Sequence, residues 1–113
     1  IAADQRQIES AARIGAPVIE LHTGAYCDAN AEGRFEDRDT ELLRLQKMSN
    51  FANSLGLEVH AGHGLTFDCV KPIAVIPQVM ELNIGHFLIG ESIFIGLEGA
   101  IKKMRNLMNE ARS

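Results

Sequence analysis

Three histidines stand beside glycines, each after a short stretch in which apolar and polar residues alternate. The three local sequences are His22-Thr23-Gly24, Gly62-His63-Gly64 and Gly85-His86. Glycine lets backbone N–H groups approach an anion closely, and a helix that begins beside it adds partial positive charge. These positions therefore favour a phosphate-binding site, although the same glycines would also suit tight turns between a strand and a helix.

His63 and Glu20 are the candidates for catalytic work. His63 lies between two glycines, so its imidazole would be accessible and able to transfer protons near neutral pH. An ordinary histidine on a surface loop would look the same in the sequence. Glu20 falls on the polar side of its segment, where a carboxylate inside a protein needs a partner. It is either the structural partner of a neighbouring basic side chain or a catalytic charge.

Two further histidines, His22 and His60, are interpreted as interior polar groups with satisfied hydrogen bonds. Together with His63 and Glu20 they could in principle hold a metal ion. The spacings, however, match no metal-binding signature, so no metal ligand is assigned.

Three strands would position these side chains, and they are predicted at residues 18–22, 57–61 and 81–85. In each of them the apolar residues fall on one side and the polar residues on the other. Because helices separate the strands, the strands are expected to be parallel and joined by right-handed crossovers.

Helical periodicity fills the segments between the strands. The first helix begins at Asp4, whose carboxylate can accept from N–H groups of the first turn, and ends at Gly15. The other helices are predicted over 39–55, after a cap at Asp68, and from about Ser92 to Ala111. Residues 24–38 are polar and contain glycine, so they are predicted to form a long surface loop of the kind that often acts as a functional flap.

The one-sided polarity of the strands favours a barrel over a doubly wound open sheet. Strands covered by helices on both faces have nearly continuous apolar runs, whereas here the polar sides would face a barrel interior. A TIM barrel needs eight strands and has its active site at their C-terminal ends. Residues 1–113 are therefore expected to be a single partial α/β domain, the C-terminal portion of a TIM barrel.

Composition narrows the class of protein. The 113 residues include 46% hydrophobic and 23% charged residues with a formal net charge of −4, which is typical of a soluble globular domain. A basic stripe for nucleic acid, an apolar run for a membrane and a signal-peptide pattern are all absent from the sequence. Cys27 and Cys69 are far apart and match no disulfide or zinc pattern, so a reducing cytoplasm is expected.

Four stretches of this sequence resemble one enzyme family, pyridoxine 5′-phosphate synthase. They are VIELHTGAY at 18–26, SLGLEVHAGHGLT at 54–66, ELNIGHFLIG at 81–90 and LMNEAR at 107–112. The combination of AGHGL and ELNIGH at this distance is highly specific, and the resemblance runs over essentially the whole chain.

The resemblance implies a cytoplasmic transferase of vitamin B6 biosynthesis. Such enzymes join 1-deoxy-D-xylulose 5-phosphate to 3-amino-2-oxopropyl phosphate, giving pyridoxine 5′-phosphate, inorganic phosphate and water. Members of the family are (β/α)₈ barrels with extra helices that assemble as homo-octamers, and their chemistry uses no metal or organic cofactor.

The resemblance also implies roles for individual residues. His63 matches the proton donor, and Gly64 matches a contact to the amino-ketone phosphate. Gly85 and His86 match the contacts to its phosphate, and Glu20 matches a glutamate that stabilises the transition state. The family's remaining catalytic residues lie in an N-terminal half that this sequence does not include. The chain is therefore expected to need that half, and the alternative is an inactive fragment or one half of a split barrel.

Overall fold

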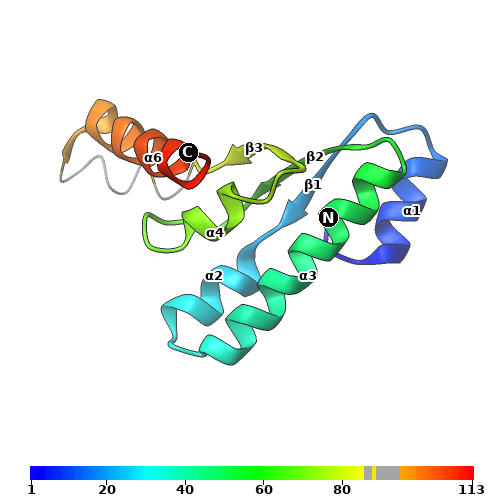
Figure 1. The fold of residues 1–113 in the computed structure, drawn as a ribbon, viewed down its shortest axis with the longest axis horizontal. Coiled ribbons are helices and arrows are strands. Elements are labelled where there is room, and N and C mark those ends of the chain that lie inside the picture. The colour runs from blue at the N-terminus through cyan, green and yellow to red at the C-terminus, as the bar shows by residue number, and fades with distance from the viewer. Residues whose placement is uncertain (86–87, 89–94) are drawn as a thin grey trace.

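Helices and strands alternate along the chain (Figure 1). A computed structural model describes residues 1–85, 88 and 95–113. The elements in chain order are α1 (Gln5–Arg13), β1 (Val18–His22), α2 (Gly24–Ala31), α3 (Phe35–Ser54), β2 (Glu58–Gly62), α4 (Val70–Ala74), β3 (Val79–Asn83) and α6 (Leu97–Ala111). None of the helices in these ranges is both long and apolar enough to cross a membrane.

The strands form one parallel sheet in the order β1-β2-β3. In its register Glu20 pairs with His60 and His60 with Glu81, so these three residues form one row across the sheet. The prediction of three parallel strands in an α/β fold is confirmed. The first strand has the predicted bounds, and the other two are shifted by one or two residues.

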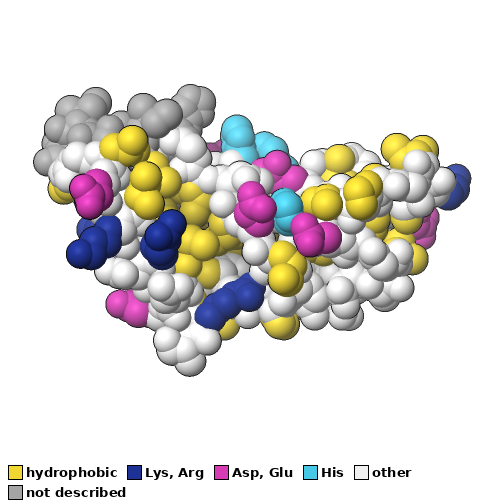
Figure 2. Space-filling model, turned by 90° about the horizontal axis from the view of Figure 1, so that it is seen from above, with side chains coloured by type: hydrophobic (Ala, Val, Ile, Leu, Met, Phe, Trp, Pro, Cys, Tyr) yellow, Lys and Arg dark blue, Asp and Glu magenta, His cyan; other side chains and the backbone are white. Residues whose placement is uncertain are grey.

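In the described part of the chain, α1 to α4 lie on one face of this sheet and α6 packs against α4 (Figure 1). The apolar sides of β1 and β2 point into the core beneath, where Ile19, Leu21, Val59 and Ala61 are at most 5% exposed. The opposite face contains the polar side chains of the strands, and histidine and acidic side chains gather there in the view from above (Figure 2). The predicted division into an apolar and a polar side is therefore confirmed in β1 and β2, whereas in β3 a register shift interrupts the alternation and leaves Met80 67% exposed.

α1 begins and ends as the sequence predicts. The Asp4 carboxylate accepts from the Arg6 N–H at 3.0 Å, which satisfies a donor of the first turn. At the other end Gly15 has a φ of +79°. This conformation suits glycine and lets Gly15 N donate to Ala12 O and Ala16 N to Ala11 O.

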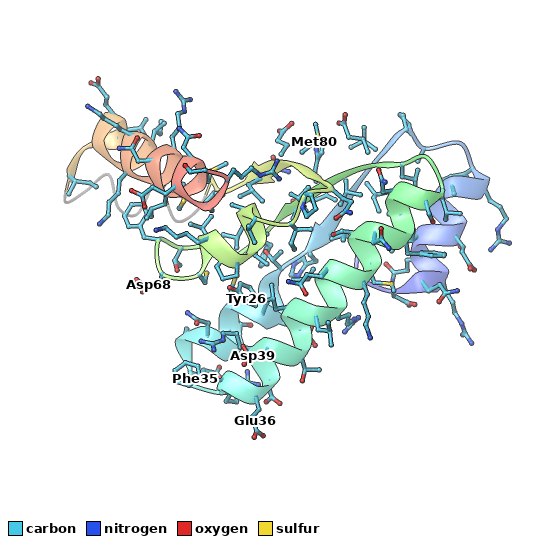
Figure 3. All side chains as sticks on the ribbon, viewed as in Figure 1. Tyr26, Phe35, Glu36, Asp39, Asp68 and Met80 are labelled. Carbon is cyan, nitrogen blue, oxygen red and sulfur yellow. The ribbon has the colours of Figure 1, made fainter. Side chains whose placement is uncertain are left out.

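The prediction of a surface loop over residues 24–38 is wrong. Residues 24–31 form α2, and α3 begins at Phe35, four residues earlier than predicted, with Glu36 in its first turn at the end far from the sheet (Figure 3). Tyr26, Cys27 and Ala29 are buried. Burial of these side chains against the core outweighs the polarity of their neighbours, which lie on the other side of α2.

Two smaller predictions also need correction. Asp68 does not cap α4, because the N-cap position is Cys69 and no side chain caps that helix. The last described helix begins at Leu97, while residues 92–94, where the predicted start falls, lie outside the described residues.

The outer edge of β1 is occupied by the first residue of the chain. Ile1 N donates to Glu20 O at 2.6 Å, and Ile1 O accepts from His22 N at 2.8 Å. This alternation of donor and acceptor around Leu21 is the hydrogen-bond pattern of a parallel strand pair. Ile1 therefore lies where a further parallel strand would add to the sheet.

Candidate active site

The C-terminal ends of the three strands meet at one edge of the sheet. His22 ends β1, Gly62 ends β2 and Asn83 ends β3, and the register places them side by side. A cleft of about 310 Å³ opens at this edge. It is lined by Glu20, His63, Gly64, Leu65, Asn83, Ile84 and Gly85. The fold thus brings together four of the five predicted site residues, and the fifth, His86, lies outside the described residues.

Glu20 projects from the uncovered face of β1 into this cleft. Its carboxylate rests on the backbone of Gly62, so that a Cβ added at residue 62 would overlap Glu20 Oε1 and come within 2.8 Å of Asn83 O. Within the described part of the chain no basic side chain forms an ion pair with Glu20. The Glu20 residue is exposed, and its carboxylate lies against a backbone position where a larger side chain would crowd it.

His63 has an unusual backbone. Its φ of +87° is positive, and no other non-glycine residue in the described ranges has a positive φ. Such a conformation costs on the order of 1–3 kcal/mol for a residue with a Cβ, although histidine tolerates it better than most. Gly64 follows with a φ of +81°. The surrounding structure must therefore hold this turn in place.

Thr23 provides the closest contacts to the turn. Its hydroxyl lies 2.8 Å from Gly62 O and 2.7 Å from His63 O, and its N–H donates to Gly62 O at 2.8 Å. The Thr23 side chain is fully buried. The hydroxyl has one proton, which the two carbonyl oxygens share, and it joins the end of β1 to the loop after β2.

The His22 ring stacks on the His63 ring, with centroids 4.1 Å apart and an interplanar angle of 28°. Gly24 N donates to His22 Nδ1 at 3.2 Å, so the neutral form of this imidazole holds its proton on Nε2. The expected hydrogen bond of His22 is found at Nδ1. The prediction that His22 is an interior group is wrong for the described chain, because the residue is exposed, and its ring lies against the predicted proton donor.

His60 lies between two carboxylates. Its Nε2 is 2.6 Å from Glu58 Oε2, and its Nδ1 is 3.8 Å from Glu81 Oε2. The interpretation of His60 as a satisfied polar group is confirmed. Among the described residues no group of three His, Cys, Asp or Glu side chains is arranged to hold a metal ion.

A pair of thiols lies directly beneath the cleft. Cys27 and Cys69 are both buried with their Sγ atoms 3.8 Å apart, although 42 residues separate them in the sequence. The hydrogen bond between the two thiols, together with Thr66 N and Oγ1 at 3.3 Å, lowers the pKa of Cys69 to about 6. The hydrogen bond with Cys69 and the burial of the side chain together raise the pKa of Cys27.

One of these two thiols, that of Cys27, lies against the turn formed by His63 and Gly64. A Cβ added at Gly64 would stand 3.2 Å from Cys27 Cβ, so the turn packs directly on Cys27. Tyr26, whose pKa burial raises, donates its hydroxyl to Cys69 O at 2.8 Å. α2 and the segment before α4 are therefore joined beneath the cleft.

The sequence profile described as "Pyridoxal phosphate biosynthesis protein PdxJ" matches residues 1–110. The chain belongs to the PdxJ family. Curated proteins named pyridoxine 5′-phosphate synthase are similar to it over its full length or nearly so. Those of Roseobacter denitrificans and Ruegeria pomeroyi are 73% and 72% identical over 113 residues, and that of Jannaschia sp. is 65% identical over 112. The chain spans about half the length of these relatives, covering 45%, 46% and 45% of them.

In this PdxJ-family chain, sequence reasoning missed Thr23 and the proximity of the two thiols. Thr23 belongs to the stretch that carries the resemblance, yet its type gives no sign that it bonds to a loop about 40 residues away. The signal that could have identified Thr23 is its polar side chain, which comes directly after a strand and faces the covered side of the sheet. Cys27 and Cys69 have no sequence spacing that would connect them.

Proposed function

We propose that this chain forms the C-terminal, phosphate-binding part of a pyridoxine 5′-phosphate synthase. The reaction is the condensation of 1-deoxy-D-xylulose 5-phosphate with 3-amino-2-oxopropyl phosphate to pyridoxine 5′-phosphate. The observation that carries the proposal is the cleft at the strand ends, where Glu20, His63, Gly64 and Gly85 face one space. The names of the similar proteins support the same reaction.

The proposed roles follow from the chemistry of each group. The condensation forms an imine and moves protons at several steps, so an imidazole on a cleft wall is suited to act as proton donor, and His63 has this position. Glu20 would stabilise the cationic imine as positive charge develops. Gly64, Gly85 and His86 would contact the amino-ketone substrate, the last two at its phosphate.

The site is proposed to be completed by a (β/α)₈ barrel of which residues 1–113 are one partial domain. No described element covers the polar face of the sheet, and Ile1 pairs with β1 as a parallel strand would. The longer relatives have an N-terminal part that could supply the other strands and catalytic groups. The intact protein would be a cytoplasmic homo-octamer that uses no metal or organic cofactor, as the family resemblance implies.

The roles can be tested in the full-length protein, meaning this sequence joined to the N-terminal part that its relatives have. His63→Ala should lower kcat by about 10²–10⁴-fold with substrate binding retained. His86→Ala should first raise KM for 3-amino-2-oxopropyl phosphate. Lys71→Ala, which removes an exposed ion pair with Glu110, is the control and should match the parent. If His63→Ala raises only KM, His63 is a binding residue and the proton-donor role is wrong.

The second candidate is an inactive fragment, or a split-barrel half that needs an N-terminal partner. The polar sheet face favours it for the 113 residues taken alone, because no described element covers this face and the polar side chains of β1 are exposed there. Purified alone, the chain should show no synthase activity, and adding the N-terminal part should restore it. Activity of the isolated chain would contradict both the barrel proposal and this candidate.

A further inference from the structure

Thr23 connects two neighbouring strand ends through one hydroxyl group. The hydroxyl is 2.8 Å from Gly62 O and 2.7 Å from His63 O, and these carbonyls belong to consecutive peptide groups. Thr23 is fully buried beneath the loop, whereas His63 and Gly64 are exposed in the cleft above it. The Thr23 hydroxyl therefore connects the interior of the fold to the part of the loop that faces the cleft.

Because the peptide group is planar, this contact also fixes the direction of two backbone N–H groups. In a trans peptide the C=O and the N–H point in opposite directions. Because the His63 carbonyl is held toward Thr23, the N–H of Gly64, in the same peptide group, points away from Thr23. The Gly62 carbonyl likewise turns the N–H of His63 away. Both N–H groups therefore point to the side of the loop opposite Thr23.

We propose that Thr23 is a positioning residue of the site, whose hydroxyl fixes the two peptide groups around His63. In this role it aims the His63 imidazole and presents the Gly64 N–H to the substrate. The inference rests on the proposed function, because it assigns Thr23 an effect only through the proton donor and the substrate contact beside it.

Other contacts to this turn are weaker or less directional. Cys27 Sγ is 3.7 Å from His63 O, and the His22 ring stacks on the His63 ring without a hydrogen bond between them. The positive φ of His63 needs a directional contact to persist, since relaxation to a negative φ would swing the imidazole out of position. Thr23 is the described residue whose short hydrogen bonds meet that need.

The test compares Thr23→Val and Thr23→Ser in the full-length protein. Valine keeps the shape of threonine and removes the hydroxyl, so kcat should fall about 10- to 100-fold, the scale expected when a reacting group is displaced by about 1 Å. Serine keeps the hydroxyl and should retain kcat to within about 3-fold of the parent on the same reasoning. A purely structural role would instead lower the melting temperature while kcat per folded molecule stayed unchanged.

A double-mutant cycle with His63→Ala shows whether Thr23 acts through His63. Without the imidazole, Thr23→Val should cause no further fall in kcat, because the group that it positions is gone. A raised KM for the amino-ketone substrate should remain, since the Gly64 N–H is still misdirected. Equal falls in kcat in both backgrounds would overturn the inference.

The two proposals fail in different ways. If His63→Ala is inactive while Thr23→Val matches the parent in kcat and KM, the positioning role is wrong and the proposed function stands. If His63→Ala keeps full activity, the proton-donor assignment fails first. Should Thr23→Val not fold, a crystal structure of the full-length Thr23→Ser protein gives the second readout. A hydroxyl bonded to both carbonyls with His63 at positive φ is expected, and a hydroxyl turned elsewhere would refute the proposal.

Discussion

The carboxylate of Glu20 and the backbone of Gly62 are in direct contact across the β1–β2 pair, and a Cβ at residue 62 would overlap Glu20 Oε1. Gly62→Ala should therefore displace the carboxylate and lower kcat in the full-length protein about as much as Glu20→Gln does. It should also lower the free energy of unfolding by about 1–3 kcal/mol, because the added methyl group crowds Asn83 O.

The double variant distinguishes the two effects of Gly62→Ala. If the loss of rate arises through Glu20, Glu20→Gln combined with Gly62→Ala should be no slower than Glu20→Gln alone. A further fall in kcat on adding Gly62→Ala would show that the methyl group disturbs another part of the site. Steady-state kinetics and urea unfolding of the four proteins provide the measurement.

Gly85→Ala is expected to separate substrate binding from folding. A Cβ at residue 85 would have no described atom within 4 Å, so the free energy of unfolding should change by less than about 0.5 kcal/mol. The methyl group would nevertheless stand in the proposed phosphate position and raise KM for 3-amino-2-oxopropyl phosphate. An unchanged KM, measured beside His86→Ala, would remove Gly85 from the phosphate site.

Arg112 should contribute strongly to the attachment of α6. Its guanidinium donates to Ala74 O at 2.6 Å, to Ile76 O at 2.9 Å and also to Val79 O. Arg112→Ala removes these three hydrogen bonds, although Ile76 O keeps the Val79 N–H as a donor, and should lower the free energy of unfolding by about 2–3 kcal/mol. The exposed ion pair between Lys71 of α4 and Glu110 of α6 is a matched control, and Lys71→Ala should cost less than about 1 kcal/mol in the same urea titration. Equal losses from the two variants would contradict the prediction.

The buried thiol pair should give stability a characteristic pH dependence. The pKa of Cys69 is lowered from 9.0 to about 6, so between pH 6 and pH 9 the folded chain binds fewer protons there than the unfolded chain. The free energy of unfolding therefore rises with pH through this window. Above pH 9.0 the unfolded chain also loses the Cys27 proton, which the folded chain retains because that pKa is raised, and stability falls again.

Cys69→Ala is the variant that tests this dependence. In the parent the urea midpoint should rise between pH 6 and pH 9. In Cys69→Ala this rise should be absent, because the group with the lowered pKa is gone. Cys27→Ala should reduce the rise, since it removes the largest cause of the lowered pKa, while the Thr66 donors remain. Parallel pH profiles for all three proteins would show that no thiolate forms in the folded chain.

The sequence predicts those features that depend on short-range rules. The alternation along residues 18–22, the Asp4 cap and the Gly15 helix end are each set by neighbours within a few positions, and all are found as predicted. Glycines after parallel strands were likewise enough to point to Gly64 and Gly85, because parallel strands end at one edge of a sheet.

The features that the sequence did not predict depend on contacts distant in the chain. α2 exists because Tyr26 and its neighbours are buried against segments some 40 residues away, and local polarity gives no hint of this. The same holds for the hydrogen bond from Thr23 to His63 O and for the Cys27–Cys69 contact. Such pairs become visible only when the strands are placed side by side.

The left-handed backbone at His63 limits which acids and bases protein engineering could place at this position. Glycine, asparagine, aspartate and histidine tolerate a positive φ, whereas longer or β-branched side chains do so poorly. Histidine is the member of that tolerant group whose proton exchanges near neutral pH. Glutamate, lysine or tyrosine at this position would therefore lower the free energy of unfolding, and a redesigned proton donor would be better tolerated at another place on the cleft wall.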